Sequence, residues 1–454
     1  MSRREHNRAY RFVRASFTII SAVLRYGWLL LRERLPPRLH PTPAHWQRAH
    51  ARTGQQILEL ASSLGGAFVK VGQIIGARAD AFPEALIAPL RALHDRMPPR
   101  PLAELRDYVR EELGGVALET VFEHVEPDAM AAASLAQVHG ARLLDGTEVV
   151  LKIQYPEARR LFPGDLASLK RAVAMVRLLA PRFDLTGLAD ELARYIVLEL
   201  EFTREAASTE RARVAFAQRA DVHVPRVYKN LSSDRLLVLE RRPGVAISQV
   251  AALRRAGIDL RALAMRVADV YCEMIFAHGF FHGDPHPGNI LVDDSGEISL
   301  IDFGLAKELP AGFALGVARM IVAGLGGDGA GALDAARAIG FRVERGDPQQ
   351  FLRLVQMMFG GFGGPEALIG VLEASDIDEV PPDLTLILRV FILLNGLSQT
   401  LAPNERLIPT AIGRALMPLL AAAGRAPGLG ADSGAGGRAA LPAPGSRSGP
   451  ALSA

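Results

Sequence analysis

The 454-residue chain contains one cysteine, Cys272, so no disulfide can form within it. A lone thiol is typical of a reducing compartment, which favours a cytoplasmic location. Cys272 lies in an apolar run, residues 270–276, that has the length and composition of helix core. We therefore expect a buried thiol with a structural role.

The chain also lacks any run of eighteen uncharged apolar residues, so we expect no membrane-spanning helix. The best candidate, residues 15–31, is interrupted by Arg25 and follows a flank rich in arginine. Its apolar residues recur at helical spacing and predict a basic amphipathic helix. That helix either lies on an anionic membrane surface or packs on the protein's own body. The apolar positions are Phe17, Ile20, Val23, Leu24, Trp28 and Leu31, and the flank holds Arg3, Arg4, Arg8, Arg11 and Arg14.

The chain also lacks a large excess of charge of either sign. The chain has 52 Lys and Arg residues against 49 Asp and Glu, a formal net charge of +3. A balance this mild does not favour nucleic acid as a partner. Apolar residues make up 49% of the chain, enough for one large core or two lobes.

The polar residues of the central segment have the spacing of a phosphoryl-transfer site. Asn289 follows Asp284 by five residues, and Asp302 follows it by eighteen. One carboxylate can orient or deprotonate an attacking hydroxyl or water, while the Asn and the second Asp hold Mg²⁺ on the phosphates of ATP. Apolar residues flank the turn at 293–296, so we expect a hairpin that places both metal ligands side by side.

These residues carry a specific resemblance. The loop at 282–289 reads His-Gly-Asp-Pro-His-Pro-Gly-Asn rather than the His-Arg-Asp form of protein kinases, and it resembles the UbiB family of atypical kinase-like proteins. That family is associated with ubiquinone and isoprenoid-lipid metabolism. The resemblance extends over residues 60–415, in the family's order. It is carried further by Lys-Val-Gly-Gln at 70–73, the alanine-rich segment at 131–139 and Val-Leu-Lys-Ile at 150–153.

Lys152 should lie on a strand. Val149, Leu151 and Ile153 alternate with it, so its ammonium points away from their apolar face and can hold the α- and β-phosphates of ATP. By resemblance, Glu205 pairs with Lys152. Residues 236–240, before Pro243-Gly244, resemble the last strand of the smaller lobe and the hinge that receives adenine.

The nucleotide loop carries alanines where other kinases carry glycines. Alanine restricts positive φ and close backbone approach, so the loop should form a stiffer cover over the phosphates. The resemblance implies altered nucleotide preference and restrained kinase activity. The residues concerned are Ala131, Ala132, Ala133 and Ser134.

A second group of residues resembles the family's regulatory motifs. Lys70 and Gln73 share one helix face, and by resemblance their helix covers the place where a protein kinase binds its peptide. Glu199 and Glu201 correspond to a Glu-x-Asp motif that faces this helix, although the second acid here is Glu. No Ala-Pro-Glu segment follows Asp302, which also disfavours a protein substrate. A zinc pair of His282 and His286 is disfavoured because prolines interrupt any helix between them.

The expected architecture is an α+β, bilobal protein-kinase-like fold with a helical N-terminal extension. It would bind ATP and Mg²⁺ and act as an ATPase or as a kinase for a lipid or quinone-precursor small molecule, at an anionic membrane surface. The alternative is a catalytically weak, nucleotide-gated scaffold for biosynthetic enzymes. The predicted segments are a basic arm (1–50), the extension (51–120), an N-lobe (121–240), a C-lobe (241–425) and a disordered tail (426–454).

Overall fold

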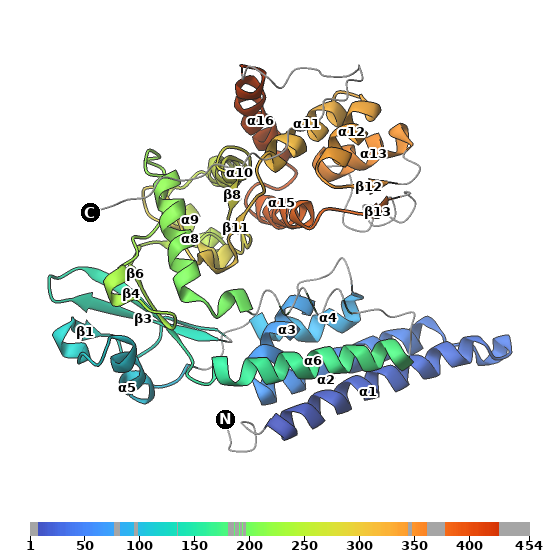
Figure 1. Cartoon of the computed structure of the whole chain (residues 1–454), viewed down its shortest axis with the longest axis horizontal. Coiled ribbons are helices and arrows are strands. Elements are labelled where there is room, and N and C mark those ends of the chain that lie inside the picture. The colour runs from blue at the N-terminus through green and yellow to red at the C-terminus, as the bar shows by residue number, and fades with distance from the viewer. Residues whose placement is uncertain are drawn as a thin grey trace, which may run out of the picture.

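The computed structural model describes residues 8–76, 82–94, 99–133, 135–179, 197–343, 347–360 and 377–425, with residues 186, 190 and 193. Ser134 and the predicted disordered tail lie outside these residues. The described chain forms a sheet-containing smaller lobe, a mainly helical larger lobe and a layer of N-terminal helices (Figure 1). This confirms the expected α+β class with a helical N-terminal extension.

The smaller lobe is built on an antiparallel sheet in the order β1-β3-β4-β6, with β2 added to β3. Val149, Leu151 and Ile153 of β4 are fully buried on one face, against helix α5 (Leu102–Glu112). Helix α8 (Phe202–Ala215) packs on the other face, where Lys152 points, as the alternation predicts. The strands are β1 (Phe122–Val125), β2 (Ala131–Ala132), β3 (Ala136–Leu143), β4 (Glu148–Gln154) and β6 (Leu236–Glu240).

The larger lobe contains the predicted hairpin. Strands β9 (Ile290–Val292) and β10 (Ile298–Leu300) pair antiparallel; β7 (Val245–Ala246) extends the sheet beside β9, and β5 (Val222–His223) lies parallel to β10. The segment after α8 therefore contributes to the larger lobe, although it precedes residue 240. Two short pairs complete the strands: β8 (Phe280–Phe281) with β11 (Lys307–Glu308), and β12 (Arg342–Val343) with β13 (Ile377–Glu379).

Helices enclose this hairpin in one large apolar core, to which α10 supplies Cys272 at 1% exposure. The prediction of a buried thiol is confirmed, and burial raises the pKa of Cys272 far above its ordinary value. The helices are α9 (Val250–Arg255), α10 (Leu260–Phe276), α11 (Phe313–Leu325), α12 (Gly329–Ala338), α13 (Pro348–Phe359), α15 (Pro382–Leu401) and α16 (Leu407–Arg425).

One of these helices bears on the membrane prediction. Within the described residues, only α15 is long and apolar enough to span a membrane by length and composition, although the sequence led us to expect none. Its buried side chains, including Leu384, Ile387 and Phe391, pack in the core of the larger lobe. A core helix passes the same test, and α15 packs as one.

The N-terminal layer consists of α1 (Arg8–Glu33), α2 (Pro43–Leu64), α3 (Ala67–Gly76) and α4 (Glu84–Leu90), joined by α6 (Ala158–Leu179) (Figure 1). Helix α2 is capped at its C-terminus by Gly65, whose N–H donates to the carbonyl of Ala61. Pro43 occupies its first turn, where a missing N–H costs nothing, and Thr42 caps it.

Helix α1 packs on the protein's own body, one of the two alternatives that the sequence left open. Arg11, which we assigned to the arginine-rich flank, is 1% exposed and pairs with Asp165 of α6. Its guanidinium also donates to the carbonyl of Leu64 at 2.6 Å. Arg25, which interrupts the apolar run, donates to Thr53 at 2.7 Å. Helix α1 is therefore docked on the body, with Arg11 and Arg25 among the residues that hold it.

Candidate active site

The Lys152 ammonium lies at the meeting point of the two lobes. It contacts both oxygens of Glu205 at 2.7 and 2.9 Å and Asp302 Oδ1 at 3.3 Å. Strand β4 supplies the lysine, α8 the glutamate and the segment after β10 the aspartate. The Lys152–Glu205 contact is the one expected from the family resemblance.

Burial controls the charges of this group. Glu205 is 3% exposed, and burial raises its pKa to about 7 although Lys152 opposes the shift. Burial also acts against the Lys152 ammonium, but Asp302 and Glu205 outweigh it and raise the pKa of Lys152 above its usual range. Burial acts to raise the pKa of Asp302. Lys152, His282 and the N–H of Gly304 outweigh burial, so the pKa of Asp302 lies below its ordinary value. Lys152 and Asp302 therefore stay charged at neutral pH.

The loop before β9 is organised by His282, which is fully buried. Its Nδ1 accepts the N–H of Asp284 at 3.2 Å, so Nε2 carries the proton and donates to the carbonyl of Ile301 at 3.0 Å. The imidazole thus fastens the Asp284 loop to the residue before Asp302. To bind zinc, His282 would have to use one of these two ring nitrogens, and both already form hydrogen bonds with the backbone.

Asp284 and Asn289 are brought together as the spacing predicts. The Asn289 amide nitrogen donates to the Asp284 carbonyl at 3.2 Å and to its Oδ2 at 3.3 Å. This orientation leaves the Asn289 amide oxygen as the group that can face a cation. Gly283, which replaces the arginine of protein kinases, is needed because a Cβ there would lie 2.3 Å from the carbonyl oxygen of Leu305.

Asp302 has a left-handed backbone, with φ 62° and ψ 73°. A non-glycine residue in this region is uncommon and carries a conformational cost, so the surroundings must fix it. Its Oδ1 accepts the N–H of Gly304 at 3.3 Å. Arg204 of α8 holds the following turn by donating to the carbonyls of Gly304 at 3.1 Å and Ala306 at 2.7 Å.

Arg204 was not among the site residues predicted from the sequence. The structure shows that it is half-buried and binds two backbone carbonyls about a hundred residues away. The only signal in the sequence was its place directly before Glu205. Nothing local indicated which backbone it would meet.

The donor set fits Mg²⁺ held jointly with phosphates. Among the described residues, no group of three or more His, Cys, Asp or Glu side chains could form an all-protein metal cage. Asp302 and Asn289 supply one carboxylate and one amide oxygen, and Mg²⁺ commonly keeps few protein ligands beside phosphate and water. These two residues would hold the ion, as predicted.

The alanine segment is part of the sheet. Ala131 pairs with Val138 and Ala132 with Gln137, and the Ala133 N–H donates to the carbonyl of Ala136 at 2.8 Å. Gln137 is fully buried and exchanges hydrogen bonds of 2.9 Å with the backbone of Arg100. A strand with its N–H groups engaged in this way offers fewer free donors to phosphate than an open glycine loop.

Lys70 of α3 reaches the same site. It forms an ion pair with Glu199, and its side chain is 19% exposed. Burial acts to lower the pKa of Lys70, but Glu199 raises it, and the carboxylates of Asp284 and Asp302 add to the increase. Helix α3 thus places a second ammonium within the field of the candidate catalytic carboxylates.

The other two residues of the predicted regulatory motifs, Gln73 and Glu201, make different contacts. Gln73 donates from Nε2 to the carbonyl of Leu93 at 2.7 Å, which ties α3 to the turn after α4. Glu201 is exposed and immediately precedes α8, where its carbonyl accepts the N–H groups of Arg204 and Glu205 at 3.1 Å. Of the two predicted acids, the structure brings Glu199 to Lys70.

Two lobes, a lysine–glutamate pair and an Asp–Asn–Asp set define a kinase-like protein. The model of the ABC1 atypical kinase-like domain matches residues 92–335, just over half of the chain. The chain therefore belongs to this family, as the UbiB resemblance implied.

Curated relatives agree with this assignment. A chloroplastic protein of Arabidopsis thaliana named ACTIVITY OF BC1 COMPLEX KINASE 8 is 39% identical over 53% of this chain and 32% of its own length. AarF domain-containing protein kinase 1 of Gallus gallus is 33% identical over 67% of this chain and 59% of its own. The chain thus spans about a third of the first relative's length and about three fifths of the second's.

A solved structure shares the fold. The erythromycin complex of Rv3197 from Mycobacterium tuberculosis superposes with a TM-score of 0.54 at 24% identity, covering 80% of this chain and 97% of that one. At this identity the likeness concerns the fold alone.

Proposed function

We propose that this chain binds ATP with Mg²⁺ and transfers the γ-phosphoryl group to water or to a small lipid-like acceptor. The observation that carries the proposal is the convergence of Lys152, Glu205 and Asp302 beside the Asp284–Asn289 pair. These five groups come from four segments, which are β4, α8, the loop before β9 and the residues after β10. A kinase-like fold needs each of them for phosphoryl transfer.

Each residue has a role in this proposal. Lys152, fixed by Glu205, holds the α- and β-phosphates, and Asp284 orients or deprotonates the attacking oxygen. Asp302 and Asn289 would hold Mg²⁺, which neutralises charge on the phosphates when bound. The left-handed backbone of Asp302, fixed by Arg204 and His282, aims its carboxylate before the nucleotide arrives.

The position of Lys70 favours a small acceptor. Helix α3 brings its ammonium into the field of Asp284 and Asp302, where a protein kinase would need room for a peptide. We propose that Lys70, Gln73, Glu199 and Glu201 regulate access of the acceptor to Asp284. The acceptors of the phosphoryl group that fit this proposal are water and a small lipid or quinone-precursor molecule.

The alternative function is a catalytically weak, nucleotide-gated scaffold. The pairing of Ala131 and Ala132 with β3 favours it, because strand pairing limits how closely the loop's backbone can approach the phosphates. Both functions require ATP binding. Turnover without added protein substrate distinguishes them.

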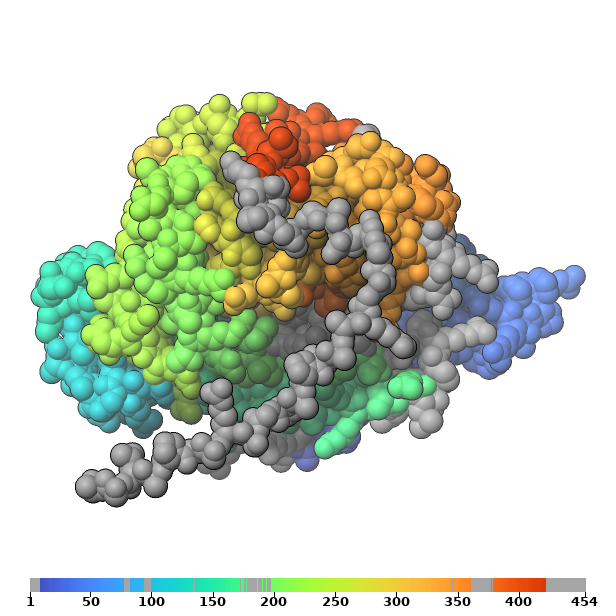
Figure 2. All heavy atoms as spheres, turned by 45° about the horizontal axis from the view of Figure 1, so that its top comes forward, coloured from blue at the N-terminus to red at the C-terminus, as the bar shows by residue number. Residues whose placement is uncertain are grey.

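The membrane part of the proposal depends on helix α1. Its outward face is apolar over six turns, and Figure 2 shows the blue N-terminal helices projecting beyond the larger lobe. We propose that this face holds the protein peripherally on an anionic membrane, where isoprenoid lipids reside. Its exposed residues are Tyr10, Val13, Phe17, Leu24, Trp28 and Leu31.

The test is Mg²⁺-dependent ATP binding and turnover by the purified chain. We expect Asp302→Asn to abolish the Mg²⁺-dependent rise in melting temperature with ATP, because it removes the charged metal ligand. Turnover should fall by about a hundredfold or more, as when a preorganised charge is removed from a transition state. Unchanged ATP protection in the variant would contradict the metal assignment, and ATP binding without turnover would favour the scaffold.

A further inference from the structure

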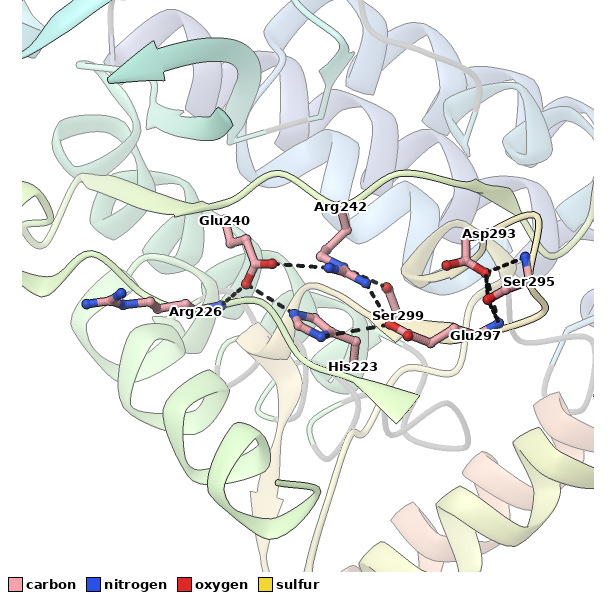
Figure 3. A network of polar contacts seen from close by, with 8 residues as sticks. All are labelled: His223, Arg226, Glu240, Arg242, Asp293, Ser295, Glu297 and Ser299. Atoms are coloured by element: carbon pink, nitrogen blue, oxygen red, sulfur yellow. Dashed lines mark hydrogen bonds and ion pairs between the residues drawn. The ribbon is translucent and has the colours of Figure 1, made fainter. Parts of the chain in front are cut away.

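A polar network that the sequence did not predict lies at the predicted hinge (Figure 3). We call it the hinge cluster. Its members belong to the end of β6, the linker that follows, β5 and the β9–β10 hairpin. They are His223, Glu240, Arg242, Glu297 and Ser299.

Arg242 is the centre of the hinge cluster. Its guanidinium contacts Glu240 Oε1 at 3.2 Å, within the segment that leaves the smaller lobe. It also donates to Glu297 Oε1 at 2.6 Å and to the Ser299 hydroxyl at 3.2 Å, both in the larger lobe. One planar cation therefore spans the two lobes, a geometry to which guanidinium is suited.

His223 closes the network from a third side. Its Nε2 lies 3.1 Å from Glu240 Oε2, and its Nδ1 lies 3.8 Å from Glu297 Oε1. Glu240 also accepts the N–H of Arg226 at 3.1 Å. Burial acts to raise the pKa of Glu240, but these hydrogen bonds outweigh it and lower the pKa below its ordinary value.

The three strands joined by the hinge cluster, β6, β5 and β10, each adjoin an element that carries a residue of the nucleotide site. Strand β6 pairs with β4 at Leu237 and Lys152. Strand β10 ends two residues before Asp302, and β5 follows α8, which bears Glu205. A shift of Arg242 relative to Glu297 would change the separation of Lys152 from Asp302.

The backbone of the linker is fixed on its other side. Gly244 has φ 121°, and a Cβ there would lie 2.7 Å from the carbonyl oxygen of Val292 at the end of β9. Immediately afterwards β7 pairs with β9. The linker is thus held to β9 by its backbone and to β10 by the Arg242 side chain, which leaves the lobes little freedom to separate.

The hinge cluster is better protected from water than an ordinary surface ion pair. The side chain of Arg242 is 17% exposed, those of Glu240 and Glu297 are 27% exposed, and Ser299 is 3% exposed. Ion pairs held in this way, with several hydrogen bonds to one Arg, are less screened than isolated pairs on the surface.

We propose that Arg242 is a positioning residue, which fixes the lobe separation at which Lys152 and Asp302 grip the same Mg²⁺–ATP. The inference rests on the proposed function, because it needs a nucleotide between the lobes. Arg242 does not contact the reacting atoms in this proposal. It acts through Glu240, Glu297 and Ser299 on the elements that do.

The experiment compares Arg242→Gln with Arg241→Gln. Arg241 is the adjacent arginine, but it pairs with Glu126 at 2.5 Å and Glu148 at 3.5 Å, both in the smaller lobe. The apparent dissociation constant for Mg²⁺–ATP is measured by thermal stabilisation, with the melting temperature of the nucleotide-free protein as a second readout.

We expect Arg242→Gln to weaken Mg²⁺–ATP binding by about fivefold or more, because small displacements of positioned groups are costly. Arg241→Gln should stay within about twofold of the unmutated chain, since its contacts do not cross the lobes. Arg242→Lys should be intermediate, because an ammonium cannot reproduce the planar fork.

Equal dissociation constants for the two Gln variants would overturn the inference. So would an Arg242→Gln protein that melts lower without nucleotide yet binds Mg²⁺–ATP as tightly as the unmutated chain, because the hinge cluster would then serve stability alone. If the unmutated chain shows no Mg²⁺–ATP stabilisation, the proposed function itself fails, and the inference falls with it.

Discussion

Lys152 lies between two carboxylates, and this sets the charge of the site. With Glu205 and Asp302 ionised, the three groups sum to one negative charge, and Asp284 stands nearby with another. A site with this excess of negative charge attracts a divalent cation, which in turn makes it receptive to phosphates. Asp284 and Asp302 also add to the effect of Glu199, which is the main group that raises the pKa of Lys70.

At the residue scale, the raised pKa of Glu205 gives a testable pH dependence. Its folded pKa of about 7 exceeds its ordinary value, so the folded protein holds this proton more tightly than the unfolded chain. The resulting stabilisation is complete below the ordinary pKa and is lost as the pH rises through 7.

Glu205→Gln mimics the protonated form and should remove this dependence. We expect the free energy of unfolding of the unmutated chain, minus that of the variant, to decrease between pH 5 and pH 8 without nucleotide. Urea titrations at both pH values measure it. A difference that stays constant or increases would show that Glu205 is already ionised at pH 5.

At the scale of elements, α1 illustrates how one helix serves two environments. Arg11, Ala15 and Leu29 face the body and are buried, whereas Phe17, Leu24 and others on the opposite face are exposed. The sequence left open whether the apolar stripe packs inward or outward. The structure shows that Arg11, Ala15 and Leu29 dock the helix. Of the predicted stripe, Phe17, Leu24, Trp28 and Leu31 are exposed, and Ile20 and Val23 are half-buried.

The Arg11–Asp165 pair should be essential for holding this layer. Both side chains are at most 3% exposed, so replacing Arg11 by Met leaves the Asp165 carboxylate buried without its partner. Burial raises the pKa of Asp165 even with Arg11 present. We expect Arg11→Met to destabilise the protein by about 3–5 kcal/mol, the usual cost of breaking a buried pair.

The matched control is Arg14→Met, one turn along the same helix. Arg14 is exposed and makes only a 3.5 Å contact with Ser63, so its loss should cost little. Denaturant unfolding of the unmutated chain, Arg11→Met and Arg14→Met measures the three free energies of unfolding. Equal midpoints for the Arg11 and Arg14 variants would show that the pair does not anchor α1.

At the scale of the whole molecule, the α1 face determines how the protein would meet a membrane. Deleting residues 1–34 would also remove Arg11, Ala15 and Leu29 from the interior, so it cannot separate docking from folding. We instead expect the triple variant Phe17→Ser, Leu24→Ser, Trp28→Ser to lose most binding to anionic liposomes while keeping its melting temperature. The three side chains are 69%, 66% and 59% exposed.

A control variant makes the same kind of change elsewhere. Val214, Ile392 and Met417 are exposed apolar residues on α8, α15 and α16, at 62%, 46% and 69%. Their replacement by Ser should leave liposome co-sedimentation intact. If both triple variants co-sediment as well as the unmutated chain, α1 is not the membrane element.

The sequence by itself determined the parts of the site that depend on local spacing. Asp284, Asn289 and Asp302 lie on one loop and hairpin, so their proximity follows from short-range pairing, and strand alternation alone directs Lys152 away from the apolar face. The family resemblance added Glu205 as its partner. Each of these residues lies where the sequence placed it.

Only the tertiary structure decided the contacts made across the fold. Arg11 meets Asp165 across 154 residues, Arg204 meets Gly304 across 100, and Arg242 meets Glu297 across 55. An arginine in a helix or linker carries the same local pattern whether water or a distant carboxylate receives it. Burial and pairing of such charges depend on which elements pack together, and no periodicity in the chain encodes that choice.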